Sequence, residues 1–174
     1  MKEVTPKLIP ELVTELANHD YRDPVEVKVV PHTISNRNEC WENVRRLVRD
    51  EGGELVSGRI VWTETRGYWL HLEAHAVWRR PDREIIDPTP KDDGEETIVF
   101  VAEDLEFVDR MIPSRYLATT DNPDVLRLIE LLIKVQEIQA SVPAGEEKRF
   151  TASEIEVIRN KDNLIKRIYF TQNR

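Results

Sequence analysis

The segment that starts at Cys40 repeats its apolar residues every three to four positions as far as Gly52. This spacing predicts an amphipathic helix with Val44 and Leu47 on its apolar face. Glycine commonly follows the end of a helix, so we expect this helix to stop at Gly52. Residues 6–18 show the same spacing behind two prolines, which predicts a shorter helix there.

Five segments are rich in β-branched and aromatic residues, as strands usually are. They are residues 25–30, 54–62, 67–80, 83–88 and 97–102. In the third segment the two faces differ: one carries Leu70, Leu72, Ala74, Ala76 and Trp78, and the other carries Trp69, His71, Glu73, His75 and Val77. Several strands therefore follow one helix. This order predicts an α+β fold, with an antiparallel β-sheet packed on the helix that begins at Cys40.

Helical spacing returns in the last third of the chain. Residues 122–140 carry apolar side chains on one face, and residues 151–154 read Thr-Ala-Ser-Glu, which is a capping box that opens a further helix. Residues 164–170 are compatible with a continuation of that helix or with an edge strand. We expect an α+β core over residues 1–118 and a helical C-terminal extension or lid over residues 119–174.

Charge and composition narrow the class of partner and the compartment. The formal net charge is −8, which argues against nucleic acid as a partner because phosphate is bound through excess Lys and Arg. No apolar run approaches the roughly 20 residues that a membrane-spanning helix needs. The N-terminal segment lacks the apolar stretch of a signal peptide, so we expect a cytoplasmic protein with no membrane partner.

The chain has a single cysteine, Cys40, at the start of the predicted helix. One cysteine can form neither an internal disulfide nor a multi-cysteine zinc site. The N–H groups and the dipole of a helix N-terminus favour a thiolate, which is the reactive form of cysteine. The alternative is that Cys40 packs as a small apolar residue, because it shares a helix face with Val44 and Leu47.

His75 and Asp87 are the candidate partners of this thiol. A catalytic imidazole needs an acceptor on its second nitrogen, and Asp87 lies in the strand that follows the strand of His75. In an antiparallel hairpin, a loop over residues 80–82 or 79–83 places His75 directly across from Asp87. A two-residue turn at residues 81–82 places the two side chains on opposite faces.

A metal site is a weaker alternative. His71, Glu73 and His75 supply ligand atoms, and Cys40 and Asp87 could add to them. Residues four apart on a strand, however, lie about 13 Å apart. Two zinc ligands each stand only about 2.1 Å from the metal. We therefore predict no metal and no cofactor.

Three sequence runs together resemble a known superfamily. They are NECWENV around Cys40, LEAHAVW around His75 and REIIDPTP around Asp87. A cysteine on a helix, then a histidine on a strand, then an aspartate on the next strand resembles the papain-like cysteine-triad superfamily, especially its transglutaminase-like branch. A similar run also occurs in small uncharacterised bacterial and phage proteins, with an N-x-C, E-x-H-x-V-W and D-x-T-P pattern.

The resemblance implies a role for each of the three residues. Cys40 would be the nucleophile, His75 the general base and then the acid, and Asp87 the orienting carboxylate. The reaction would be hydrolysis or acyl transfer at an amide or peptide bond, through a thioester, with a peptide or amide substrate that a protein could supply. A non-catalytic protein-binding module on the same fold is the alternative.

The resemblance also implies an oxyanion donor and a substrate cleft. Papain-type enzymes place a Gln shortly before the cysteine, and this chain has none there. Asn36 or Asn38 would substitute for it, although Asn38 also suits the helix N-cap. Trp69, Glu73 and His71 share the strand face of His75 and are the candidate substrate-lining residues.

Overall fold

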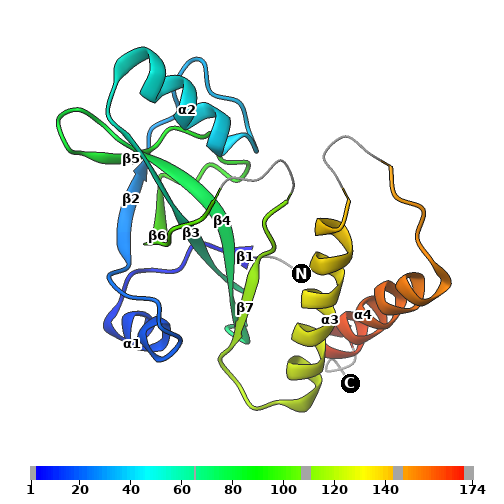
Figure 1. The fold of residues 1–174 in the computed structure, drawn as a ribbon. Helices are drawn as coiled ribbons and strands as arrows, with labels where there is room; N and C mark the ends of the chain where they lie inside the picture. The colour runs from blue at the N-terminus through cyan, green and yellow to red at the C-terminus, as the bar shows by residue number, and fades with distance from the viewer. Residues whose placement is uncertain (1–2, 65, 107–110, 143–146, 171–174) are drawn as a thin grey trace. The chain divides into compact units, whose positions relative to one another are not determined.

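The structure, a computed structural model, describes residues 3–64, 66–106, 111–142 and 147–170. Helices and strands alternate irregularly along these ranges (Figure 1). In chain order they are β1 Glu3–Val4, α1 Pro10–Asn18, β2 Val25–Val29, α2 Cys40–Glu51, β3 Glu54–Glu64, β4 Trp69–Arg79, β5 Ile85–Asp87, β6 Thr97–Ala102, β7 Arg115–Ala118, α3 Pro123–Ala140 and α4 Ala152–Phe170. The predicted α+β class is confirmed.

The chain forms two compact units. One, which we call the barrel unit, comprises Thr5–Trp62 and Glu73–Phe107. The other, which we call the helical unit, comprises Met1–Val4, Thr63–Leu72 and Val108–Arg174. Strands β3 and β4 each contribute residues to both units. The predicted division at residue 118 stays a prediction.

Five strands close on themselves in a barrel. The sheet order is β1-β3-β6-β2-β5-β4-β7, and β3 also pairs with β4, so β3, β6, β2, β5 and β4 form a closed ring. Adjacent pairs in the ring are antiparallel where their register is defined, except β2–β5, which is parallel. The expectation of an antiparallel sheet is thus wrong for one pair. Strands β2 and β5 are separated in sequence by α2, β3 and β4, a connection long enough for parallel pairing.

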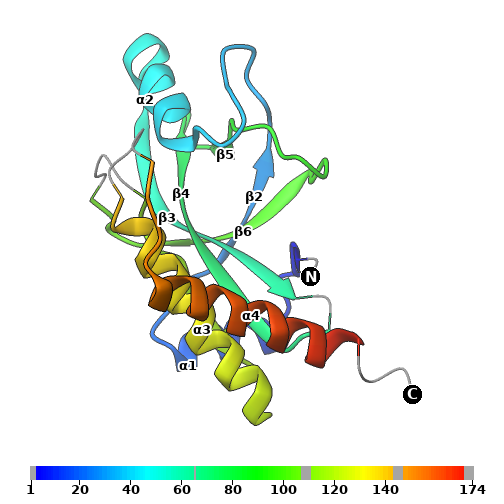
Figure 2. The same ribbon diagram turned by 90° about the vertical axis from the view of Figure 1, so that its right-hand side faces the viewer.

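Helix α2 covers the outer face of β4 and β5. Its Val44 and Leu47 pack against Ala76, Trp78 and Ile86. The helix ends as predicted at Gly52, whose φ is 81°. The Trp78 indole donates a hydrogen bond to the Gly52 carbonyl at 2.9 Å and so ties the helix end to β4. Figures 1 and 2 show α2 and α1 near opposite ends of β2.

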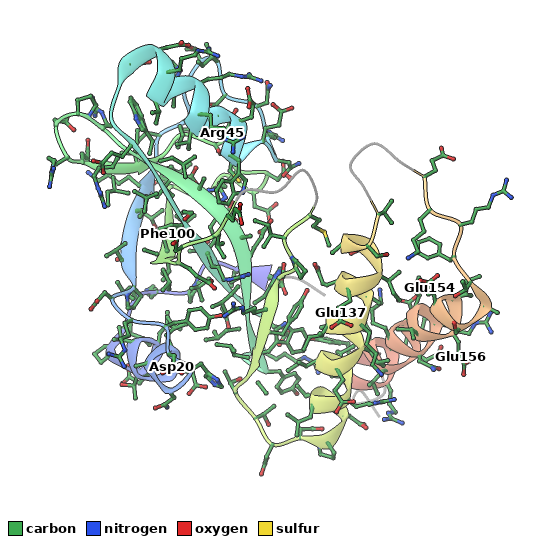
Figure 3. All side chains as sticks on the ribbon, viewed as in Figure 1. Asp20, Arg45, Phe100, Glu137, Glu154 and Glu156 are labelled. Carbon is green, nitrogen blue, oxygen red and sulfur yellow. The ribbon has the colours of Figure 1, made fainter. Side chains whose placement is uncertain are left out.

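The inner face of β4 points into the barrel. Val77 belongs to an apolar cluster with side chains from β2, β3 and β6, namely Val27, Ile60, Ile98 and Phe100; Figure 3 labels Phe100 among these strands. Successive strand residues alternate in direction, so His75 is on the same side as Val77. Closure of the barrel buries this inner face of β4. In an open sheet, another helix or strand would have had to pack on it.

The β4–β5 hairpin sets the register of the candidate site. Arg83 donates a backbone hydrogen bond to Arg80 and has φ 75°, so the loop covers residues 81–83. The resulting register pairs Trp78 with Ile86. It places Asp87 across from Val77, two positions from the predicted partner His75. The observed register is neither of the two considered from the sequence, and it keeps both side chains on one face.

In the helical unit, α3 and α4 lie side by side (Figure 2). Asn122 caps α3 by accepting from the Asp124 N–H. The capping box of α4 is confirmed, because the Thr151 N–H donates to the Glu154 carboxylate and the Glu154 N–H donates to the Thr151 hydroxyl. Residues 164–170 continue α4, which resolves the choice between helix and strand.

The core of the helical unit surrounds Trp69. Around its indole pack apolar residues of α3 and α4, namely Val125, Leu128, Ile129, Leu131, Leu132, Leu164 and Ile168. Within the described residues, no helix is both long enough and apolar enough to cross a membrane.

Gly58 offers a test of barrel closure. A Cβ at this position would overlap the Val101 carbonyl and the Phe100 ring. We expect Gly58→Ala to lower the free energy of unfolding by about 1–3 kcal/mol, measured by urea denaturation. Gly94→Asn is the control, since Gly94 has open space around it and Asn tolerates its positive φ. Equal stability of Gly58→Ala and the wild type would contradict close packing at β3–β6.

Candidate functional site

Cys40 is the first residue of α2 and is half-buried. The N-cap residue is Glu39, whose side chain makes no capping hydrogen bond. The prediction that Asn38 caps the helix was wrong, because the chain takes a left-handed turn there, with φ 60° at Asn38. The dipole at the start of α2 therefore acts on the thiol without a capping side chain.

The Cys40 thiol and the His75 imidazole are near enough that each shifts the pKa of the other. His75 is buried, and its Nε2 lies 2.9 Å from the Asp87 carboxylate. This contact occupies Nε2, so a proton exchanged with the thiol would have to use Nδ1. The Ala76 backbone N–H also lowers the pKa of the Cys40 thiol. The structure thus brings together the three residues predicted from the sequence.

Asp87 is fully buried and is surrounded by donors. Its Oδ2 accepts from His75 and lies 2.5 Å from Lys91 Nζ. Its Oδ1 accepts from the Thr89 backbone N–H at 2.9 Å. The backbone carbonyl of Asp87 accepts from the Val30 N–H, which holds the end of β5 against β2. A buried carboxylate needs such donors to replace the water it has lost.

The charges of the three groups reinforce one another. Burial opposes ionisation of His75, but the Asp87 carboxylate and the Cys40 sulfur outweigh it and raise the pKa of His75 to about 9. Burial likewise opposes the thiolate, but the charge and hydrogen bond of His75 outweigh it and lower the pKa of Cys40 below its ordinary value of 9.0. Burial also opposes the Asp87 carboxylate, but His75 and then Lys91 lower its pKa.

Asn43 connects the cysteine helix to the aspartate strand. It is fully buried one turn after Cys40, and its Nδ2 donates to the Asn36 carbonyl at 2.7 Å and to the Thr89 hydroxyl at 3.1 Å. Its Oδ1 accepts from the Asn36 N–H at 2.9 Å. Sequence reasoning missed this residue. The sequence feature that could have identified Asn43 is its position next to the apolar face of an amphipathic helix, where a polar amide needs hydrogen-bond partners.

Lys91 is the second residue that sequence reasoning missed. Its side chain is 9% exposed, and its Nζ lies 3.4 Å from His75 Nε2 as well as against Asp87. The sequence gives no signal for this contact, because Lys91 lies in a loop where no helix or strand spacing relates it to Asp87. The path of residues 88–90 brings the lysine back against the carboxylate.

Three candidate substrate-lining residues have other contacts. Trp69 is 0% exposed in the core of the helical unit, so its indole is not available to line a cleft. His71 contacts the Glu3 carboxylate at 2.7 Å. Glu73 accepts a hydrogen bond from the Trp62 indole at 2.9 Å. Trp69 and His71 belong to the helical unit, whereas the triad lies in the barrel unit.

The two candidate oxyanion donors lie in the loop before α2. The Asn36 side chain donates to the Glu39 carboxylate at 2.9 Å, so its amide is engaged within the loop. Asn38 is exposed beside it. Among the described residues, no group of three or more His, Cys, Asp or Glu side chains could hold a metal ion.

The chain was compared with protein-family models, with curated proteins and with solved structures. None of these comparisons found a match. The geometry of the site and the chemistry of its side chains are therefore what indicate a function.

Asn43 allows a test of the framework around the site. Asn43→Ala leaves the Asn36 backbone groups and the Thr89 hydroxyl without this partner. We expect it to lower the free energy of unfolding by about 1–3 kcal/mol in urea denaturation. The control is Arg46→Ala at a partly exposed position of α2, which removes ion pairs with Glu42 and Glu39 and should cost less than about 1 kcal/mol. Equal effects of the two substitutions would show that the Asn43 bridge contributes nothing special.

Proposed function

We propose that this protein is a cysteine-dependent hydrolase or acyltransferase that acts on an amide or peptide-type bond through a thioester. The observation that carries the proposal is the buried His75, which contacts the Asp87 carboxylate through Nε2 at 2.9 Å and lowers the pKa of the half-buried Cys40 thiol. A thiol, a base and an orienting carboxylate in this order form an activated nucleophile.

The proposed resting state is a thiolate–imidazolium pair. The pKa of Cys40 falls below its ordinary 9.0, while the pKa of His75 rises to about 9. Both shifts favour the form in which the proton resides on His75 rather than on Cys40. A thiolate is the nucleophilic form of cysteine, and the imidazolium beside it is ready to act as an acid.

In the first half of the reaction, the Cys40 sulfur attacks the carbonyl carbon of the substrate and forms a C–S bond. The carbonyl π electrons move to oxygen, which becomes an oxyanion. When the carbonyl re-forms, the C–N bond breaks, and the His75 Nδ1 proton passes to the leaving amine. The products of this half are a thioester on Cys40, a free amine and a neutral His75.

In the second half, neutral His75 removes a proton from water or from an acceptor amine. The resulting nucleophile attacks the thioester carbon, and the C–S bond breaks. The acyl group leaves as a carboxylic acid or as a new amide. The electron pair of the C–S bond returns to sulfur, which restores the thiolate and the imidazolium. Asp87 remains ionised throughout and holds the imidazole through Nε2.

The backbone N–H of Cys40 is the proposed oxyanion donor. It lies in the first turn of α2, where helix N–H groups have no partner within the helix and the dipole favours negative charge. A single oxyanion donor contributes about 3 kcal/mol to known acyl-transfer reactions. The side chain of Asn38 is the proposed second donor, because that of Asn36 is already bonded to Glu39.

A relationship to the papain-like and transglutaminase-like enzymes is part of this proposal. It is supported by a nucleophile at a helix start, followed by a histidine and an aspartate on the two strands of one hairpin. The sheet of this protein closes into a five-stranded barrel, so the α+β fold class by itself is not evidence for the relationship. A free cysteine also suits a reducing compartment, which is why we propose the cytoplasm as the location.

The reactivity of Cys40 tests the proposed ion pair. At pH 7 we expect iodoacetamide to alkylate Cys40 roughly tenfold or more faster than free cysteine, because more of the thiol is ionised. The alkylation rate should reach half its plateau at a pH below 9.0. His75→Ala should remove the advantage, since burial then raises the pKa of the thiol without compensation.

Glu73→Ala is a matched control, since Glu73 is on the same strand but bonds Trp62. It should leave the alkylation rate within about twofold of wild type. If Cys40 is alkylated no faster than free cysteine and His75→Ala does not change that rate, the enzyme proposal is contradicted and the binding module becomes the better interpretation.

A substrate screen tests the acyl-transfer step. Peptide, simple amide and isopeptide substrates should be cleaved by the wild type and not by Cys40→Ala. With a good substrate, mass spectrometry after acid quenching should find the acyl group on Cys40 as a thioester. Asp87→Asn should lower kcat on the order of 10²-fold or more, because the imidazole loses its orienting charge. Cleavage that survives Cys40→Ala would contradict a cysteine nucleophile.

A further inference from the structure

We propose that Lys91 is a positioning residue of this site, which shares Asp87 Oδ2 with His75 and offsets the negative charge that the triad would otherwise bury. This inference rests on the proposed cysteine chemistry. It adds a fourth charged group whose part in the reaction differs from that of the three triad residues.

The position of Lys91 comes from an ordered run of backbone. Residues 88–90 read Pro-Thr-Pro, and each proline holds its φ near −65°. The Thr89 N–H bonds the Asp87 carboxylate, and the Pro88 carbonyl accepts from the His32 N–H at 3.1 Å. The segment is therefore fastened on both sides before it reaches Lys91. Its ammonium lies 2.5 Å from Asp87 Oδ2 and 3.4 Å from His75 Nε2.

The charge of the site explains why a cation at this place matters. In the reactive form Cys40 carries one negative charge, His75 one positive charge and Asp87 one negative charge. Three such groups in contact would leave one net negative charge buried, which is costly. The ammonium of Lys91, itself only 9% exposed, brings the group of four to neutrality.

Other charged groups near the site already have partners. On α2, the carboxylates of Glu39 and Glu42 both contact Arg46. After Lys91, Asp92 forms an exposed ion pair with Arg37. These pairs lie in solvent, where charge is screened. Lys91 is thus the cation that the described contacts place directly against the buried carboxylate.

The consequence for the reaction concerns the proton of His75. That proton must leave the imidazole when the amine departs, yet a lone buried carboxylate would hold it tightly. Lys91 takes part of the negative charge of Asp87 Oδ2 and also repels the imidazolium at close range. It therefore weakens proton binding at His75, and its positive charge favours the thiolate at Cys40. Both ionisations should then occur at lower pH than in a site without Lys91.

The experiment compares three substitutions in the full chain. Lys91→Met removes the charge and the hydrogen bond, Lys91→Gln removes the charge but keeps a donor, and Lys91→Arg keeps both. Lys28→Met, on the exposed side of β2, is the control for loss of a lysine from the same unit. The ultraviolet absorbance of the thiolate reports Cys40, and the ring-proton NMR signals report His75, each followed against pH.

We expect both midpoints to move upward by about one pH unit or more in Lys91→Met and Lys91→Gln. Lys91→Arg and Lys28→Met should retain the wild-type midpoints. At pH 7, iodoacetamide should alkylate the two neutral variants roughly tenfold more slowly than wild type, with the difference removed by raising the pH. A purely structural role would lower stability without moving the midpoints.

The outcomes separate this inference from the proposed function. If the wild-type thiol titrates like free cysteine, the cysteine chemistry itself fails. If the wild type shows the activated thiol but folded Lys91→Gln keeps both midpoints, the role of Lys91 is overturned. Lys91→Gln keeps a polar hydrogen-bond donor at this position, so it provides the decisive comparison where Lys91→Met fails to fold.

Discussion

The buried carboxylate of Asp87 is the constraint on which the rest of the site depends. A carboxylate without water needs donors, and each donor comes from a different part of the barrel unit: His75 from β4, Thr89 from the adjoining backbone and Lys91 from the segment beyond it. The hydrogen bonds that Asp87 accepts therefore hold the β4–β5 hairpin, the loop after β5 and the imidazole in place together. The position of the candidate nucleophile follows from that of the imidazole.

The barrel and α2 make this arrangement possible by giving β4 two buried faces. The outer face packs Ala76 and Trp78 against the helix, and the inner face carries His75 beside the apolar interior. The helix that buries the outer face also delivers Cys40 at its first residue. Packing and chemistry thus use the same element. Asn43, one turn further along α2, bonds both the loop before Cys40 and Thr89, so the helix cannot shift independently of β5.

The electrostatics show why a histidine and a cysteine can hold opposite charges in a place with little water. Burial disfavours the charged form of each group separately. Each of the two groups favours the charged form of the other. Asp87 and Lys91 add a negative and a positive charge, so that four groups of alternating charge lie together. The functional proposal and the inference about Lys91 are two consequences of this one balance.

The sequence by itself determined most of the elements and the three residues of the candidate triad. Periodicity located the helices and strands β2 to β6 but neither β1 nor β7, Gly52 marked the end of α2, and the capping box marked the start of α4, because these signals depend on residues close in the chain. The sequence left open whether His75 and Asp87 share a face, because that depends on the hairpin register. Tertiary structure decided the closed barrel, the parallel β2–β5 pair and the hairpin register. It also decided the contacts of Asn43 and Lys91, because these join segments whose approach no local period encodes.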